Sequence, residues 1–130
     1  MLKFLNKIVK KKWLPLTWTI LTIVLLCLPG STLPGGGLFN IPQLDKVAHI
    51  ILFGGLVLLW MLHLQNNGAS SALILLLIII IFSIGLGIIL EFVQMNFIPH
   101  RSFDQGDIIA DVAGSLSAGL LTYFYVRKRK

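Results

Sequence analysis

The acidic side chains of this chain all fall near the ends of hydrophobic segments. They are Asp45, Glu91, Asp104, Asp107 and Asp111. Ionisable groups are costly beside lipid unless they pair with one another or serve a function. Lys46 and Arg101 accompany the acids, whereas the remaining basic residues lie in residues 3–12 and 127–130. The sequence therefore predicts a polar site at one face of a membrane, where carboxylates could transfer protons or hold a cation or a basic group.

Three pairs of polar residues have helical spacing. Residues three or four positions apart share one face of a helix. The pairs are Asp45 with His49, Glu91 with Gln94, and Asp107 with Asp111. We expect these pairs to converge, because the alternative places several polar groups against lipid at about 3 kcal/mol each near mid-membrane.

The same residues leave several kinds of chemistry open. In an enzyme, Glu91 or Asp111 would act as the general base and His49 as an acid or an orienting group. In a metal site, carboxylates and one imidazole would suit Mg²⁺, Mn²⁺ or Ca²⁺ better than Zn²⁺, although no metal-binding sequence motif is present. In a structural network, Lys46 would pair with Asp104 and lock the loops together.

Four apolar segments must position these side chains. They are Trp13–Leu28, Leu44–Leu64, Ala72–Met95 and Asp107–Val126. Each has about 16 to 24 residues, close to the ~20 that cross ~30 Å of hydrocarbon as a helix. With 56% hydrophobic residues and a mean hydropathy of +0.89, the chain is far from the composition of soluble domains. We therefore predict an all-α integral membrane four-helix bundle.

The distribution of charge predicts the orientation of this bundle. The predicted parts are a basic amphipathic segment (residues 1–12), the membrane domain (13–126) and a basic tail (127–130). Four crossings return both ends to one side, and the excess of Lys and Arg places that side in the cytoplasm. The acids and the uncharged loop of residues 29–43 then face outward, and Trp13 and Trp18 are expected at the interface. The net charge of +6 is expected to meet lipid phosphate rather than nucleic acid.

Small residues in the last segment predict close packing of helices. Gly114 and Ala118 are four positions apart, as are Ser115 and Gly119, and such spacing lets two membrane helices approach closely. Glycines in the second and third segments are expected to do the same. These are Gly54, Gly55, Gly85 and Gly87.

Two motifs between about residues 40 and 120 carry a family resemblance. They read Asp45-Lys46-x-x-His49-x-x-x-Phe53-Gly54, and Glu91-x-x-Gln94 followed by Pro99-His100-Arg101-x-Phe103-Asp104-x-x-Asp107-x-x-x-Asp111-x-x-Gly114. They resemble the VanZ-like family of small bacterial membrane proteins, named for a protein associated with teicoplanin resistance. The resemblance implies a multi-pass protein of the bacterial cytoplasmic membrane related to glycopeptide tolerance, and it supplies no reaction. Members often carry Gly in place of His100 and Asn in place of Asp111, so Asp111 adds a charge here.

We predict that the polar residues form an outward-facing site for an envelope ligand. The predicted site comprises Asp45, Lys46, His49, Glu91, Gln94, Arg101, Asp104, Asp107 and Asp111. A membrane lipid or a lipid-linked cell-wall precursor would bring a polar head to Arg101, whose planar fork suits phosphate and carboxylate, and an apolar tail to the helix grooves. The alternatives are a membrane-embedded hydrolase or transferase that uses paired carboxylates, and a small lipid transporter or flippase. Because the segments are apolar at mid-membrane, a transport path would require a homo-oligomer.

Overall fold

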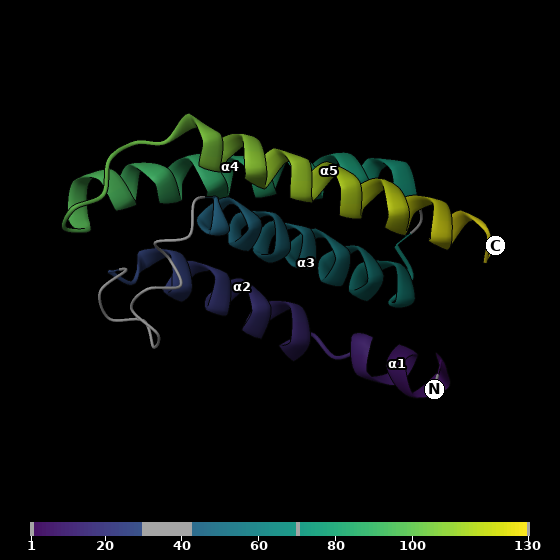
Figure 1. Ribbon diagram of the computed structural model, residues 1–130. Coiled ribbons are helices and arrows are strands. Elements are labelled where there is room, and N and C mark those ends of the chain that lie inside the picture. The colour runs from purple at the N-terminus through teal and green to yellow at the C-terminus, as the bar shows by residue number, and fades with distance from the viewer. Residues whose placement is uncertain (1, 30–42, 70, 130) are drawn as a thin grey trace.

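The structure is a computed structural model that describes residues 2–29, 43–69 and 71–129, and these residues form helices without strands. The helices are α1 (Leu2–Val9), α2 (Trp13–Cys27), α3 (Leu44–Asn66), α4 (Ala72–Phe97) and α5 (Gln105–Arg127). Figure 1 shows α2 to α5 lying side by side as an elongated bundle, with α1 at the end that holds both chain termini. The predicted outer loop falls largely in residues 30–42, which lie outside the described residues.

The helix bounds confirm the four apolar segments predicted from hydropathy. Helices α3, α4 and α5 are each long and apolar enough to cross a membrane. Helix α2 is apolar but has only 15 residues, which span about 22 Å, so it is the shortest of the four. In lipid every backbone N–H and C=O must bond within the protein, which is why such apolar segments form helices. The chain is therefore a helical membrane bundle.

Helices α3 and α5 pack most closely, because glycines lie where they meet. A Cβ atom added to Gly54 would lie 3.3 Å from the carbonyl oxygen of Gly114 and 3.7 Å from Cβ of Ala118. A Cβ atom added to Gly114 would lie only 2.9 Å from Cα of Ile50. Gly114 and Ala118 therefore form the stripe of α5 that faces α3, as the sequence predicts.

The second stripe of small residues on α5 faces α4. Oγ atoms of Ser115 and Ser83 are hydrogen-bonded at 2.8 Å in the buried interior. A Cβ atom on Gly119 would lie 2.7 Å from a methyl group of Leu76. The two sets of small residues thus let α5 approach two different neighbours. Gly85 does not take part, because nothing lies within 4 Å of a Cβ atom placed there.

Trp18 belongs to the bundle rather than to the membrane interface, which corrects its predicted role. Its indole Nε1 donates a hydrogen bond of 2.9 Å to the carbonyl of Leu52 on α3, and its ring packs against Gly55. The half-buried indole finds its hydrogen-bond acceptor on a neighbouring helix, so the ring lies between α2 and α3. Trp13, with 67% of its surface exposed, remains free for the predicted interfacial position.

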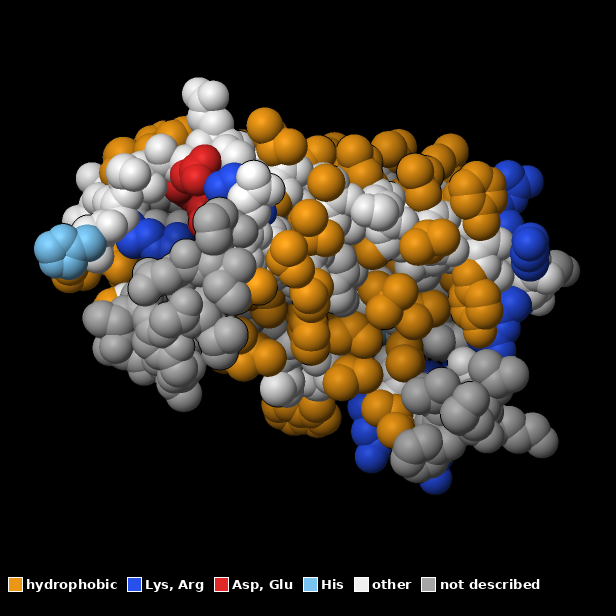
Figure 2. Space-filling model, in the orientation of Figure 1, with side chains coloured by type: hydrophobic (Ala, Val, Ile, Leu, Met, Phe, Trp, Pro, Cys, Tyr) orange, Lys and Arg blue, Asp and Glu red, His pale blue; other side chains and the backbone are white. Residues whose placement is uncertain are grey.

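The two chain ends meet at the basic end of the bundle. Arg129 donates a 3.3 Å hydrogen bond to the side chain of Asn6, and His63 contacts the carbonyl of Val9 at 3.0 Å. Asn67 donates to the carbonyl of Lys10 at 3.2 Å. Figure 2 shows basic side chains gathered at this end and acidic side chains only near the other.

Candidate functional site

The N-terminus of α5 lies at the acidic end of the bundle. The carboxylate of Asp104 accepts a 2.7 Å hydrogen bond from the backbone N–H of Gly106, which caps the helix. Because of this cap, α5 begins at Gln105, two residues before the predicted start at Asp107. Asp107 therefore occupies the first turn and Asp111 the next, and each is only 2% exposed.

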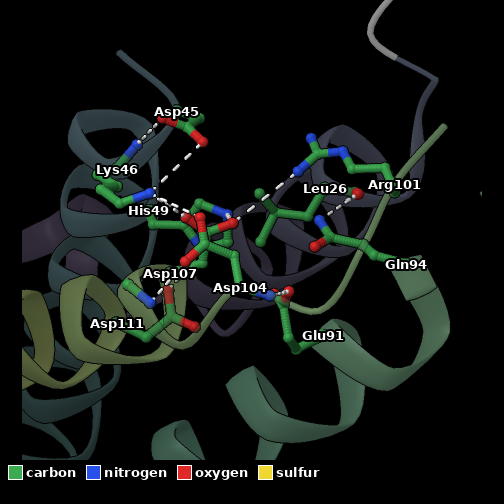
Figure 3. A network of polar contacts seen from close by, with 11 residues as sticks. Leu26, Asp45, Lys46, His49, Glu91, Gln94, Arg101, Asp104, Asp107 and Asp111 are labelled. Atoms are coloured by element: carbon green, nitrogen blue, oxygen red, sulfur yellow. Dashed lines mark hydrogen bonds and ion pairs between the residues drawn. The ribbon is translucent and has the colours of Figure 1, made fainter. Parts of the chain in front are cut away.

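Lys46 lies among three carboxylates. Its Nζ is 2.8 Å from Asp104, 3.3 Å from Asp107 and 3.8 Å from Asp45 (Figure 3). Oxygen atoms of the same three acids lie within 4.8 Å of one another, which is a spacing that could suit a cation. The ammonium group of Lys46 already supplies a positive charge to all three, so this part of the site is the ion-pair network predicted for Lys46 and Asp104.

His49 is buried between two carboxylates of α5. Its Nδ1 lies 2.8 Å from Oδ1 of Asp111, and its Nε2 lies 3.6 Å from Oδ2 of Asp107. Nε2 has no hydrogen-bond partner among the described residues. A neutral imidazole carries one N–H, whereas an imidazolium offers a proton to both carboxylates. The polar faces of α3 and α5 therefore meet at His49, Asp107 and Asp111, as the helical spacing predicts.

The backbone at Gly87 makes room for Asp111. A Cβ atom added to Gly87 on α4 would lie 2.5 Å from Oδ2 of Asp111, so even alanine would collide with the carboxylate. From its sequence, Gly87 was expected only to let helices pack closely. Its position four residues before Glu91, on the same face of α4, was the signal that links it to the polar site.

Glu91 and Gln94 leave α4 from the same face but bond in different directions (Figure 3). Oε1 of Glu91 accepts a 2.6 Å hydrogen bond from the backbone N–H of Asp104, so it holds the loop before α5. Nε2 of Gln94 donates a 2.7 Å bond to the carbonyl of Leu26 in the last turn of α2. That carbonyl lacks a partner within its own helix, and Gln94 supplies one. Gln94 is therefore a tie between α4 and α2 rather than a member of the carboxylate cluster.

Arg101 has the loosest pairing of the charged groups here. Its Nη1 lies 3.9 Å from Oδ2 of Asp107, and 26% of its side chain is exposed. It borders a small pocket of about 80 Å³ between α2 and α3. The apolar walls are Leu25, Leu26, Ala48 and Leu52, and the polar lining is Asp45, His49 and Arg101. The pocket thus combines a hydrocarbon-like wall with a guanidinium group that is only loosely paired.

Beyond the polar site, the interior of the bundle is mostly apolar, and its buried polar side chains are Ser and Thr hydroxyls. A core of buried side chains fills the space towards the basic end: Leu56, Val57, Met61, Leu76 and Ile79. Between this core and the acids, the hydroxyl pair of Ser83 and Ser115 is satisfied by its own hydrogen bond. The acidic side chains are therefore concentrated at one end of the described helices.

The stability of the site should depend on pH through Asp104. The hydrogen bond from Lys46 and that from the Gly106 N–H hold the pKa of the Asp104 carboxyl below its ordinary value. A carboxyl with a lower pKa in the folded protein stabilises the fold above its unfolded pKa of about 4, and that contribution disappears as the pH falls through the folded pKa. We expect wild-type protein to unfold at a higher temperature than Asp104→Asn at pH 7, and the difference to shrink as the pH falls below about 4.

Thermal unfolding in detergent micelles between pH 7 and pH 3 would measure this difference. Asp104→Asn keeps a side-chain oxygen for the helix cap, so the change isolates the charge. A difference that stays constant over this range would show that the charge on Asp104 does not stabilise the fold.

The comparisons with known proteins identify the family of this chain. The family model described as VanZ/LLP1 matches residues 2–127. An uncharacterized protein of the fission yeast Schizosaccharomyces pombe is 32% identical over 91 residues, which are 68% of this chain and 52% of that protein. The chain therefore spans about half the length of that relative, and no solved structure matches. The match over nearly the whole chain confirms the predicted family: the chain belongs to the VanZ/LLP1 family.

Proposed function

We propose that this protein binds an amphipathic envelope ligand in the pocket between α2 and α3. The ligand would be a lipid-linked or cell-wall precursor whose head carries phosphate or carboxylate. One observation carries the proposal: the pocket pairs four apolar wall residues with an incompletely paired guanidinium group. Ligand sites in proteins commonly have this composition, a mostly apolar wall with a few placed polar groups.

Arg101 is the residue that would recognise the head. Its five N–H donors form a rigid fork that matches the oxygens of phosphate or carboxylate. Lys46 is held by three carboxylates, so its role in the proposal is to fix Asp104 and Asp107 in place. Asp45, with 36% of its side chain exposed, would accept a hydrogen bond from a hydroxyl or amino group of the ligand.

Catalysis is the second candidate, because of one specific contact. Asp111 orients His49 through Nδ1 and leaves Nε2 without a hydrogen bond, which is how a carboxylate presents an imidazole as a general base. However, Nε2 faces Asp107 at 3.6 Å rather than the open pocket. Binding therefore has the stronger support. Transport has less, because the interior beyond the site is apolar.

We propose that the site faces outward from the cytoplasmic membrane. Basic residues crowd the end that carries both termini, and such residues favour the cytoplasmic side. The pocket would then face outward from the cytoplasmic membrane. There it would reach cell-wall precursors, and its action would affect tolerance to glycopeptide antibiotics.

The experiment is native mass spectrometry of protein extracted gently from its own membranes. We expect wild-type protein to retain a phosphate- or carboxylate-bearing amphiphile and Arg101→Lys to retain at least about tenfold less, because a lysine cannot form the bidentate contact. Ile81→Val is the matched control, because Ile81 on α4 is 71% exposed and remote from the pocket, and it should retain the wild-type amount. In cells, Cys27→Ala protein with His100→Cys should react with a membrane-impermeant maleimide added outside. Equal retention by all three proteins, or labelling only after lysis, would overturn the proposal.

A further inference from the structure

A second concave surface lies at the basic end of the bundle, remote from the acidic site. Two hollows of about 320 and 390 Å³ open between α1, α3 and α5. Both are lined by Asn6, Leu62, Asn66 and Tyr125, so they form one continuous groove. This groove is distinct from the pocket beside Arg101.

The groove is apolar at one end and basic at the other. Leu58 and Leu121 line its inner part, each one helical turn further from the basic end than Leu62 and Tyr125. Lys10 and Arg129 line its outer part. An amphiphile with a hydrocarbon chain and an anionic head is the complement of this gradient.

No acidic side chain is available to the cations of the groove. All five acids belong to the opposite end of the described helices, where they contact Lys46, His49, Arg101 and the loop before α5. Arg129 instead contacts the neutral amide of Asn6 at 3.3 Å and lies 5.1 Å from the ring centroid of Tyr125. The charge that balances Lys10 and Arg129 must therefore come from outside these side chains.

Gln65 gives independent support for a polar ligand in the groove. The residue lines the basic part, and both its side-chain oxygen and nitrogen are buried without a hydrogen-bond partner among the described residues. Leaving a buried amide without partners is unfavourable, so such groups normally find a partner in protein, water or ligand. A lipid head that carries phosphate oxygens and hydroxyl groups offers both an acceptor and a donor.

We infer that the groove binds one anionic phospholipid of the leaflet at the basic end. The phosphate lies between Lys10 and Arg129, the polar head bonds to Gln65, and an acyl chain follows Leu58 and Leu121. Because α1 forms one wall through Asn6 and Val9, the bound lipid also fastens α1 to α3 and α5. The lipid thus joins the first and last helices of the chain.

Native mass spectrometry of the purified full-length protein with phosphatidylglycerol or phosphatidylcholine would test this inference. Wild-type protein should bind one phosphatidylglycerol at least tenfold more tightly than phosphatidylcholine. The double variant Lys10→Gln with Arg129→Gln should lose that preference. Lys11→Gln with Lys128→Gln removes the same charge from neighbouring positions that do not line the groove, and it should stay within threefold of wild type.

A third variant separates a ligand contact from a structural one. Gln65→Leu should weaken phosphatidylglycerol binding about fivefold while leaving the thermal stability of the lipid-free protein unchanged or higher, because it removes an unbonded buried amide. Arg101→Lys should bind phosphatidylglycerol normally, since the groove is independent of the proposed envelope site. Equal losses in the two double variants would show diffuse attraction to basic residues. That result, or the same affinity of wild type for both lipids, would overturn the inference.

Discussion

Asp107→Ala is expected to lower the free energy of unfolding by about 3 kcal/mol, because removing one member of a buried ionic group leaves its partners uncompensated. Asp107 is 2% exposed and lies 3.3 Å from Lys46, 3.6 Å from His49 and 3.9 Å from Arg101. Its carboxylate thus contacts basic side chains both from α3 and from the loop before α5. Unfolding in mixed detergent micelles, followed by circular dichroism, would measure the loss.

Asp45→Ala is the matched control for this prediction. Asp45 is also an aspartate in the first turn of a helix and also pairs with Lys46, but at 3.8 Å and with 36% of its side chain exposed. Exposed ion pairs contribute at most about 1 kcal/mol, so we expect a loss no larger than that. If both variants lower the free energy of unfolding equally, the burial of Asp107 does not strengthen its ion pairs, and the loops rather than the carboxylate hold the network together.

The helices were predictable because lipid leaves the backbone few alternatives. A long apolar segment in hydrocarbon must satisfy its N–H and C=O groups internally, so hydropathy alone gave α3 and α4 with ends correct to within two residues. The start of α5 was missed by two residues because a side-chain cap determined it. The carboxylate of Asp104 bonds to the N–H of Gly106, and hydropathy contains no information about that bond.

The site was predictable as a group of residues but not as a set of partners. Helical spacing placed His49 and Asp111 on polar faces at one end of the bundle, and they meet at 2.8 Å. The rotation of each helix about its axis decides which polar groups meet, and that rotation follows from close contacts between helices. Gln94 was expected among the acids, yet the rotation of α4 aims it at the carbonyl of Leu26. The sequence therefore predicts which polar groups lie at the site, whereas the packing of the helices determines which of them are in contact.

Gly114 is where this dependence on packing can be tested most directly. Gly114→Ala would bring a Cβ atom against the backbone of Ile50 on α3, with Cα of Ile50 only 2.9 Å away. A side chain could rotate aside, but a helix backbone cannot, so α3 and α5 must separate. Overpacking of this kind costs about 1–3 kcal/mol, and we expect the upper end because the obstacle is backbone.

Gly85→Ala is the control that isolates this collision. Both substitutions add one methyl group to a helix, so both gain the same helix propensity of up to about 1 kcal/mol. A Cβ atom on Gly85 meets nothing within 4 Å, so that variant should be as stable as wild type or slightly more stable. The difference in stability between the two variants therefore measures the effect of the close contact between α3 and α5 alone.

Since Asp111 lies one turn before Gly114 and contacts His49 across the same interface, separation of the helices should also loosen the buried pair. Hydrogen exchange at the start of α5 should then increase in Gly114→Ala and not in Gly85→Ala. Equal unfolding temperatures for the two variants would mean that the small-residue stripe does not hold α3 against α5, and the polar site would have to be held together from its own end.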